Sequence, residues 1–140
     1  MSNVPFIVLV EDNLPDVFLV RTALEQTGFK FQLQVFSDGD EAFDYFLGFE
    51  RDTIDRRPDL LLIDLNLPRR SGRELLQGLV ERSGKTLPSF IVISSSDSPD
   101  DKLAAQRLGA AHFFRKPAEL DEFMKLGNVV VEVLGNIATK

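Results

Sequence analysis

Five short apolar runs, separated by segments of helical spacing, constrain the fold of this chain most strongly. Residues 6–10, 60–64 and 90–94 read FIVLV, LLLID and FIVIS, and such runs are typical of strands covered on both faces. FQLQVF at 31–36 alternates apolar and polar residues, which predicts a strand with one wetter face. HFFR at 112–115 predicts a short fifth strand.

A helical pattern follows each of these runs. After the first run, apolar residues recur at mostly helical spacing, and Gly28 provides a stop signal. Ser98 or Asp97 is expected to cap a later helix, with Pro99 in its first turn and Gly109 just past its end. The predicted helices cover residues 14–26, 41–47, 71–80, 99–108 and 120–134, and loops are predicted at 48–58 and 83–89.

The alternation of strand and helix, repeated five times, indicates the α/β class with a doubly wound parallel sheet. Right-handed crossovers place helices on both faces of such a sheet. No internal repeat or linker interrupts the 140 residues, so we expect a single domain over residues 1–140. The functional crevice of this architecture lies at the carboxyl ends of the strands.

The composition excludes several classes of function. The chain has no cysteine, which excludes a disulfide framework, a thiolate metal site and a cysteine nucleophile. A formal net charge of −6 argues against direct binding of nucleic acid, because a phosphate backbone repels it. The first residues do not resemble a signal peptide, and no stretch is long enough to span a bilayer, so we expect a cytoplasmic protein without membrane contact.

Polar and charged residues stand at the ends of all five predicted strands, although those after the second, Ser37 and Asp38, are typical of an ordinary turn. Glu11 and Asp12 follow the first, Asp64 ends the third, Ser94 ends the fourth, and Lys116 follows the fifth. Asp12 and Asp64 would repel each other in one crevice, and Mg²⁺, which prefers oxygen ligands, would relieve that repulsion. The ammonium of Lys116 and the hydroxyl of Ser94 could contact phosphoryl oxygens there.

Most of these residues also have a purely structural interpretation. Glu11 and Asp12 could favour the N-terminus of the next helix, Ser94 could be a turn hydroxyl, and Lys116 could be a surface lysine. Asp64 is harder to explain in this way, because a buried carboxylate without a partner is costly. The joint pattern, rather than any one residue, indicates a functional site.

That pattern resembles the receiver domain of two-component response regulators, the CheY-like family. The resemblance rests on VEDN at 10–13, LLLIDLNLP at 60–68, the serines at 94–96 and RKP at 115–117. The intervals of 30 residues from the aspartate to the first serine, and of 22 from that serine to the lysine, also agree with the family. The resemblance covers essentially the whole chain and implies a flavodoxin-like (βα)5 fold with strand order 2-1-3-4-5.

The resemblance implies a role for each matching residue. Asp64 is the phosphoacceptor, whose carboxylate attacks the phosphohistidine of a sensor histidine kinase. Asp12 is the main acidic Mg²⁺ ligand, Glu11 assists through a metal-bound water, and Asn66 offers its backbone carbonyl to the same ion. Mg²⁺ and Lys116 neutralise charge during phosphoryl transfer.

A switch surface is implied as well. Ser94 is the hydroxyl that moves toward the phosphoryl group, and Phe113 lies where family members often carry an aromatic that changes rotamer with it. Core packing is the alternative for Phe113 in a chain with 12 phenylalanines. The fourth helix, fifth strand and fifth helix form the output face. The Val-rich segment at 126–136 suggests a homodimer through that face, since exposed apolar patches are usually interfaces.

Several positions depart from the commonest receivers. Ser94 stands where Thr is commoner, Arg115 stands where a small or β-branched residue is usual, and Arg70-Ser71-Gly72 replaces the frequent Met-Asp-Gly. None of these changes removes a chemical group that the mechanism needs. The insertion at 48–58, with DLNLP and RRSGRELL, resembles the subgroup that pairs with bacterial phytochromes. The single histidine, His112, excludes a multi-histidine site and is expected to be structural or near the output face.

Three other functions are compatible with the same architecture. An aspartyl phosphatase of the haloacid dehalogenase type normally carries a second acid where this chain has Asn66. We therefore expect that the protein is not an enzyme and that its own phosphoryl group is lost slowly by self-dephosphorylation. A flavodoxin-like ligand site would need a phosphate-binding loop where Glu11 and Asp12 stand. The main alternative is an interaction module of the same fold that works without phosphorylation.

Overall fold

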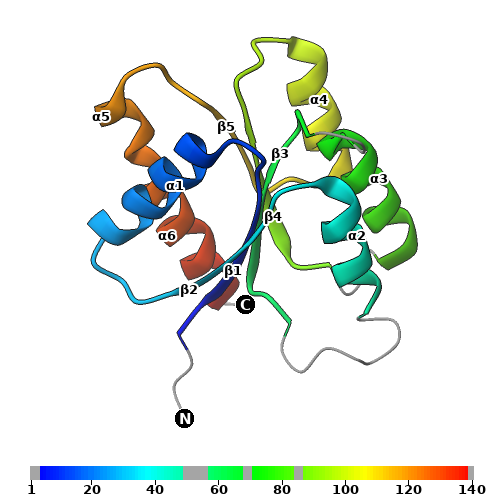
Figure 1. Cartoon of the computed structure of the whole chain (residues 1–140), viewed down its shortest axis with the longest axis horizontal. Helices are drawn as coiled ribbons and strands as arrows, with labels where there is room; N and C mark the ends of the chain where they lie inside the picture. The colour runs from blue at the N-terminus through cyan, green and yellow to red at the C-terminus, as the bar shows by residue number, and fades with distance from the viewer. Residues whose placement is uncertain (1–3, 49–56, 68–70, 84–86, 139–140) are drawn as a thin grey trace.

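The computed structural model describes residues 4–48, 57–67, 71–83 and 87–138 and shows a five-stranded sheet between two layers of helices (Figure 1). All neighbouring strands are parallel, and their order is β2-β1-β3-β4-β5. The predicted fold class and strand order are therefore confirmed. The strands are β1 (Phe6–Val10), β2 (Gln32–Phe36), β3 (Leu60–Asp64), β4 (Ser89–Ser94) and β5 (His112–Arg115).

Helices cover both faces of the sheet. Figure 1 shows α1, α5 and α6 on one face and α2, α3 and α4 on the other. Among the described residues, none of the helices combines the length and the apolar character needed to cross a membrane. The helices are α1 (Leu14–Gln26), α2 (Gly39–Leu47), α3 (Gly72–Ser83), α4 (Pro99–Leu108), α5 (Leu120–Phe123) and α6 (Lys125–Ala138).

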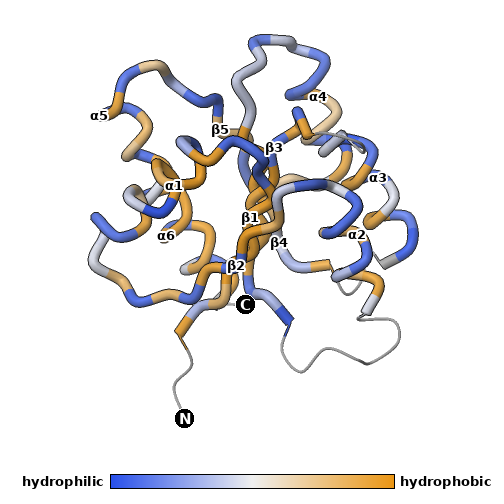
Figure 2. The backbone as a smooth tube through the Cα atoms, in the orientation of Figure 1, coloured by the Kyte–Doolittle hydropathy of each residue, from blue (hydrophilic) through white to orange (hydrophobic). Residues whose placement is uncertain are grey.

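The sheet separates two hydrophobic cores, because successive side chains of a strand point to opposite faces. Val8, Leu61 and Val92 belong to the core under α2, α3 and α4. Ile7 and Leu62 belong to the core under α1 and α6. Figure 2 shows hydrophobic residues concentrated along the central strands. All five residues of β3 are buried, including Asp64 at its end, so the carboxylate of Asp64 lies largely away from water.

The two edge strands are short and partly polar. The β2 strand has five residues, and Gln32 and Gln34 are exposed on it. The β5 strand has four residues, with His112 and Arg115 exposed at its two ends. The alternation predicted for residues 31–36 is therefore seen in β2.

The last helix differs from its prediction. A single helix was expected over 120–134, whereas the structure has α5 and α6 on either side of Met124. Met124 keeps helical dihedral angles, but the N–H of Gly127 donates to the carbonyl of Met124, three residues back, at 3.1 Å. Such a tightened turn does not alter the apolar periodicity, so the sequence pattern cannot reveal it.

The remaining predicted elements agree to within a few residues. Helix α3 continues to Ser83, three residues beyond its prediction, and α2 begins two residues earlier than expected. Ser98 occupies the predicted N-cap position of α4, but its side chain makes no capping hydrogen bond. Most of the predicted loop at 48–58, like residues 84–86 of the loop at 83–89, lies outside the described residues.

Replacing Gly127 by alanine is expected to loosen the packing of α6 on α1. A Cβ at this position would lie 2.3 Å from the carbonyl oxygen of Ala23 and 2.6 Å from Cγ2 of Thr27. Such overpacking should lower the free energy of unfolding by about 2 kcal/mol, measured by urea denaturation. The matched control is Gly135→Ala in the same helix, where a Cβ meets no atom within 4 Å. Its higher helix propensity should stabilise the protein by about 0.5–1 kcal/mol, and equal effects of the two changes would contradict the packing argument.

Candidate functional site

The carboxyl ends of four strands bring the predicted residues together. Glu11 follows β1, Asp64 ends β3, Ser94 ends β4, and Lys116 follows β5. Asp64 pairs in register with Ile93, so Asp64 and Ser94 lie on neighbouring strands, one position apart. The exposed fractions of Glu11, Asp64 and Ser94 are 2%, 4% and 0%. Polar groups buried to this degree need partners within the protein.

The ammonium of Lys116 is the common partner of the carboxylates. Its Nζ atom lies 2.7 Å from Oε1 of Glu11, 2.7 Å from Oδ2 of Asp16 and 2.9 Å from Oδ2 of Asp64. The three hydrogens of the ammonium thereby each have an acceptor. The side chain is only 10% exposed, so these charge-assisted hydrogen bonds form largely away from water. One cation therefore joins β1, α1 and β3.

Asp16 is a member of the site that the sequence analysis missed. It lies in the first turn of α1, and its amide donates to Oδ1 of the N-cap residue Asn13 at 3.0 Å. An acid at this position has a sufficient local explanation, because carboxylates stabilise the N-terminus of a helix. The sequence did contain a signal for Asp16, because it follows Asp12 by four residues. The first turn of a helix places such a residue beside the end of the preceding strand.

Burial and crowding alter protonation at this site. Burial raises the pKa of Glu11 to about 7, with the nearby Asp64 adding to the rise and the hydrogen bond from Lys116 opposing it. Burial alone would lower the pKa of Lys116, but its hydrogen bonds to Asp16, Glu11 and Asp64 outweigh burial and raise that pKa. Lys116 therefore stays charged at neutral pH, whereas Glu11 takes up a proton more readily than an ordinary glutamate.

Three carboxylates are arranged as a possible metal site. One oxygen each of Glu11, Asp12 and Asp64 lies within 4.8 Å of the others. Asp12 is exposed, so the site is open to solvent on that side. All of these donors are oxygens, which suits Mg²⁺. With Asp16 included, the cluster holds four carboxylates, three of which contact the ammonium of Lys116, and a dication would offset the excess negative charge.

Asn66 lies beside this cluster. Its N–H donates to Oδ1 of Asp64 at 2.9 Å, while its side chain is exposed. The other oxygen of Asp64 accepts from Lys116, so both oxygens of the carboxylate are oriented by hydrogen bonds. The backbone around Asn66 is thereby tied to the residue that the sequence predicts as phosphoacceptor.

Serine hydroxyls hold the loop between β4 and α4. The N–H of Ser96 donates to Oγ of Ser94 at 3.1 Å, and the N–H of Ser98 donates to Oγ of Ser96 at 3.0 Å. On its other side, Ser94 accepts through its carbonyl from the amide of Lys116 at 2.7 Å. Because Oγ of Ser94 is the acceptor in its bond to Ser96, its own hydrogen remains available as a donor.

Gly72 lets α3 begin directly against the end of β3. Its N–H donates to the carbonyl of Leu65 at 2.9 Å. A Cβ at this position would lie 2.0 Å from the backbone oxygen of Asp64 and 2.7 Å from Cα of Leu65. No side chain fits there unless the backbone that carries the Asp64 carboxylate moves. Close packing against the end of β3 therefore explains why position 72 is a glycine.

A comparison with protein families identifies this arrangement. The family model of the response regulator receiver domain matches residues 7–127, which is most of the 140-residue chain. The chain belongs to the response regulator receiver family. The resemblance inferred from the four motifs is confirmed by this match.

Individual relatives of this receiver include regulators associated with phytochromes. Response regulator Rcp1 of Synechocystis sp. is 30% identical over 126 residues, which cover 89% of this chain and 86% of Rcp1. The structure of the phosphorylated cyanobacterial phytochrome response regulator RcpA matches with a TM-score of 0.82 and 30% identity over 94% of each chain. The Mn²⁺-bound form of Rcp1 matches with a TM-score of 0.77 and 28% identity over 90% of this chain and 91% of that one.

Two residues singled out in the sequence lie outside the carboxylate cluster of this receiver. Phe113 is half-buried in β5 and packs against the core under α2, α3 and α4. This packing agrees with its structural interpretation, and its switch role stays a prediction. His112 is exposed on the same edge strand, and its place near an output face stays a prediction.

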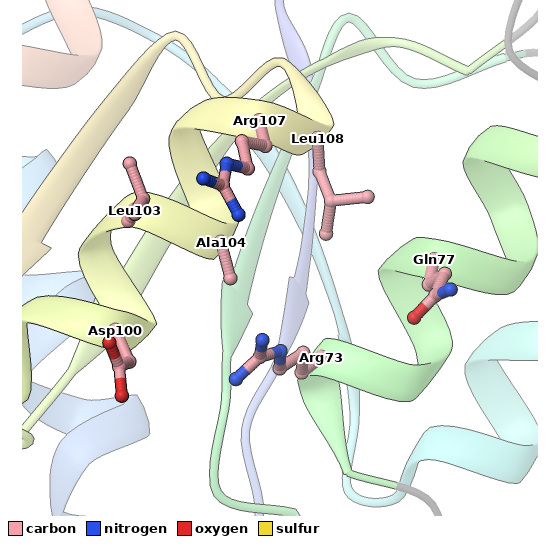
Figure 3. Close-up of a pocket in the computed structure, with 7 residues that line it drawn as sticks. All are labelled: Arg73, Gln77, Asp100, Leu103, Ala104, Arg107 and Leu108. Atoms are coloured by element: carbon pink, nitrogen blue, oxygen red, sulfur yellow. The ribbon is translucent and has the colours of Figure 1, made fainter.

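A groove of about 310 Å³ lies elsewhere on the receiver, between α3 and α4 (Figure 3). Arg73 and Gln77 line it from α3, and Asp100, Leu103 and Arg107 are among the residues that line it from α4. It shares no residue with the carboxylate cluster. The groove and the carboxylate cluster are therefore two separate features of the surface.

Replacing Lys116 by methionine is expected to destabilise the receiver when divalent cations are removed with EDTA. The change keeps the apolar stem but leaves Glu11, Asp16 and Asp64 without their shared cation. Loss of one partner from a buried ionic cluster should lower the free energy of unfolding by roughly 3 kcal/mol, measured by urea denaturation.

The matched control for this change is Lys125→Met. Lys125 pairs with Glu122, but its side chain is 64% exposed. Exposed pairs contribute little, so the control should change stability by less than about 0.5 kcal/mol. Similar values for the two variants would show that the contacts of Lys116 do not hold the site together.

Proposed function

We propose that this receiver is a single-domain response regulator that accepts a phosphoryl group on Asp64 from the phosphohistidine of a sensor histidine kinase. The proposal is carried by the buried ammonium of Lys116, which lies 2.9 Å from Oδ2 of Asp64. A carboxylate beside a fixed cation combines a nucleophile with a partner for the incoming phosphoryl oxygens. The phosphorylated relative RcpA and the extent of the match to Rcp1 support this function.

We infer Mg²⁺ as the metal of the site. The oxygens of Glu11, Asp12 and Asp64 that lie within 4.8 Å of one another fit a hard dication, and the backbone carbonyl of Asn66 is the further ligand that we propose. The Mn²⁺-bound structure of Rcp1 supports a divalent ion in a relative. When bound, the ion would supply positive charge against the phosphoryl oxygens.

The transfer itself needs few groups from the protein. A carboxylate oxygen of Asp64 forms a bond to phosphorus while the bond from phosphorus to the donor nitrogen breaks, and that nitrogen keeps the electron pair. Lys116, held by Glu11 and Asp16, directs its ammonium toward the phosphoryl oxygens. Asn66 cannot carry a proton for an attacking water, so the only turnover that we infer is slow self-dephosphorylation.

Ser94 is the group that we propose as the sensor of phosphorylation. Its hydroxyl hydrogen is free to donate to a phosphoryl oxygen, and the hydrogen bond from Ser96 would carry its movement into the loop before α4. Phe113, three residues before Lys116, is the proposed second switch residue. The proposed output face consists of α4, β5 and α6.

Apolar side chains beside the site support a protein as the phosphoryl donor. Leu14 and Phe18 are 77% and 67% exposed on successive turns of α1, close in sequence to Asp12. Leu120, at the start of α5, is 58% exposed and follows Lys116 by four residues. Exposed apolar surface of this kind suits a helical kinase domain. We infer a phytochrome-linked cytoplasmic kinase, by analogy with RcpA, and the net charge of −6 supports a protein partner over nucleic acid.

Incubation with acetyl phosphate and Mg²⁺ is expected to add one phosphoryl group to the protein. Acetyl phosphate tests the chemistry of the site without a kinase, and intact mass spectrometry measures the gain. EDTA should abolish the gain, because the carboxylate cluster would then lack its dication. Asp64→Asn should abolish it as well, because an amide oxygen is a poor nucleophile.

The control variant for this experiment is Asp121→Asn, which changes an exposed acid of α5. It should be phosphorylated like the unchanged protein. A gain of mass that survives Asp64→Asn would place the acceptor elsewhere. No gain under any condition would favour the interaction module that works without phosphorylation.

A homodimer through the output face is a further part of the proposal. The Val-rich segment is less exposed than the sequence suggested, because Val130 and Val133 are buried in the core. Val131 is 43% exposed on α6, and Leu103 is 44% exposed on α4. These two residues are the apolar contacts that we propose for the interface.

Multi-angle light scattering is expected to give a mass near twice 15.7 kDa in at least one of the two phosphorylation states. Val131→Glu should restore the monomer mass, because it would bury a charge in the proposed interface. Glu132→Gln, an exposed neighbour, is the control and should leave the dimer intact. A monomer mass for the unchanged protein, with and without acetyl phosphate, would exclude the homodimer.

A further inference from the structure

An ion pair ties the loop between β4 and α4 to the end of β5. Nε of Arg115 lies 2.5 Å from Oδ1 of Asp97, and Nη2 of Arg115 donates to Oδ2 of Asp97 at 2.9 Å. Both oxygens of the carboxylate are used, in the bidentate geometry that gives an arginine pair a fixed orientation. Arg115 is also a departure from the commonest receivers that the phosphorylation chemistry itself leaves unexplained.

Each residue of this pair is next in sequence to a residue that is hydrogen-bonded to Ser94. Asp97 follows Ser96, whose N–H donates to Oγ of Ser94. Arg115 precedes Lys116, whose amide donates to the carbonyl of Ser94. The ion pair therefore closes a ring of contacts that runs from β5 through the loop and back to the end of β4. Among the described residues, opening it would leave the loop held on that side by the hydrogen bonds of its serines.

The position of the loop matters for an attacking water. Hydrolysis of the phosphoryl group on Asp64 needs a water in line with the bond that breaks, so the water approaches from the solvent side of the site. The loop after β4 forms part of the rim on that side, because it leaves the sheet at its carboxyl edge beside Asp64. A loop held in one position limits the water that can reach phosphorus.

We propose that the Arg115–Asp97 ion pair latches the loop between β4 and α4 against β5 and thereby prolongs the lifetime of the phosphoryl group on Asp64. This inference rests on the proposed function. In the step that the latch slows, water forms a new bond to phosphorus, the bond from phosphorus to the Asp64 oxygen breaks, and inorganic phosphate and the free carboxylate are released. Arg115 and Asp97 are positioning residues, since they act through the loop.

The exposure of the pair sets the size and the salt dependence of its effect. The side chains of Arg115 and Asp97 are 58% and 75% exposed, so solvent screens their attraction. An exposed ion pair of good geometry should lower the equilibrium constant for opening of the loop by about two- to five-fold. Salt at about 0.5 M should remove much of that effect, because the screening length then falls well below 10 Å.

The test compares phosphoryl lifetimes after loading with acetyl phosphate and Mg²⁺ and removal of the donor. Arg115→Ala and Asp97→Ala should each shorten the lifetime by about two- to five-fold, and the double variant should be no worse than either single one. The exchanged variant, Arg115→Asp with Asp97→Arg, should recover the lifetime. High salt should shorten the lifetime of the unchanged protein but not that of the single variants.

The matched control is Arg107→Ala, an exposed arginine of α4 outside this contact, which should keep the original lifetime. Unchanged lifetimes in both single variants, or a failure of the exchanged pair to recover what they lose, would overturn the latch. A purely structural loss of the loop would not be recovered by exchanging the charges.

Hydrogen exchange separates a failure of the latch from a failure of the proposed function. The amides of Ser96 and Ser98, measured by NMR in the unphosphorylated protein, should exchange about two- to five-fold faster in Arg115→Ala than in the unchanged protein. If acetyl phosphate loads no phosphoryl group, the proposed function fails, and this exchange measurement still decides whether the ion pair holds the loop. Equal exchange rates would overturn the latch in that case.

Discussion

The ammonium of Lys116 is the interaction on which the arrangement of this receiver depends. Three carboxylates from β1, α1 and β3 converge on it within 2.9 Å, in a region where a carboxylate without a cation would be costly. The same contacts that satisfy these buried groups orient Asp64 and keep Lys116 charged. The stability of the buried cluster and the orientation of Asp64 therefore both require the charged ammonium of Lys116. The sheet brings the ends of four strands together around it.

Much of the fold follows from features that are local in the sequence. A run such as LLLID is buried on both faces wherever it lies in a parallel sheet, so its strand is readable without knowledge of its neighbours. The break at Met124 is different, because it results from a single tightened turn where α6 packs against α1 through Gly127. The apolar spacing of residues 120–134 contains no trace of this turn.

The residues of the candidate site also fall into those that the sequence predicts and those that it does not. Glu11, Asp64, Ser94 and Lys116 were predictable because each stands next to the end of a strand, and strand ends meet in this architecture. Asp16 was not, since its place in the first turn of α1 is explained equally well by the needs of the helix itself. The depth of burial and the distances that join these groups to one ammonium come only from the three-dimensional arrangement of the chain.

The composition of the two sheet edges has a consequence for the behaviour of the protein in a crowded solution. An uncovered edge strand offers unpaired backbone groups that could recruit a strand from another molecule and begin aggregation. Here β2 presents Gln32 and Gln34, and β5 has four residues with His112 and Arg115 exposed at its ends. Short edges with polar and cationic side chains make such recruitment unfavourable, so aggregation through the edges of the sheet is disfavoured.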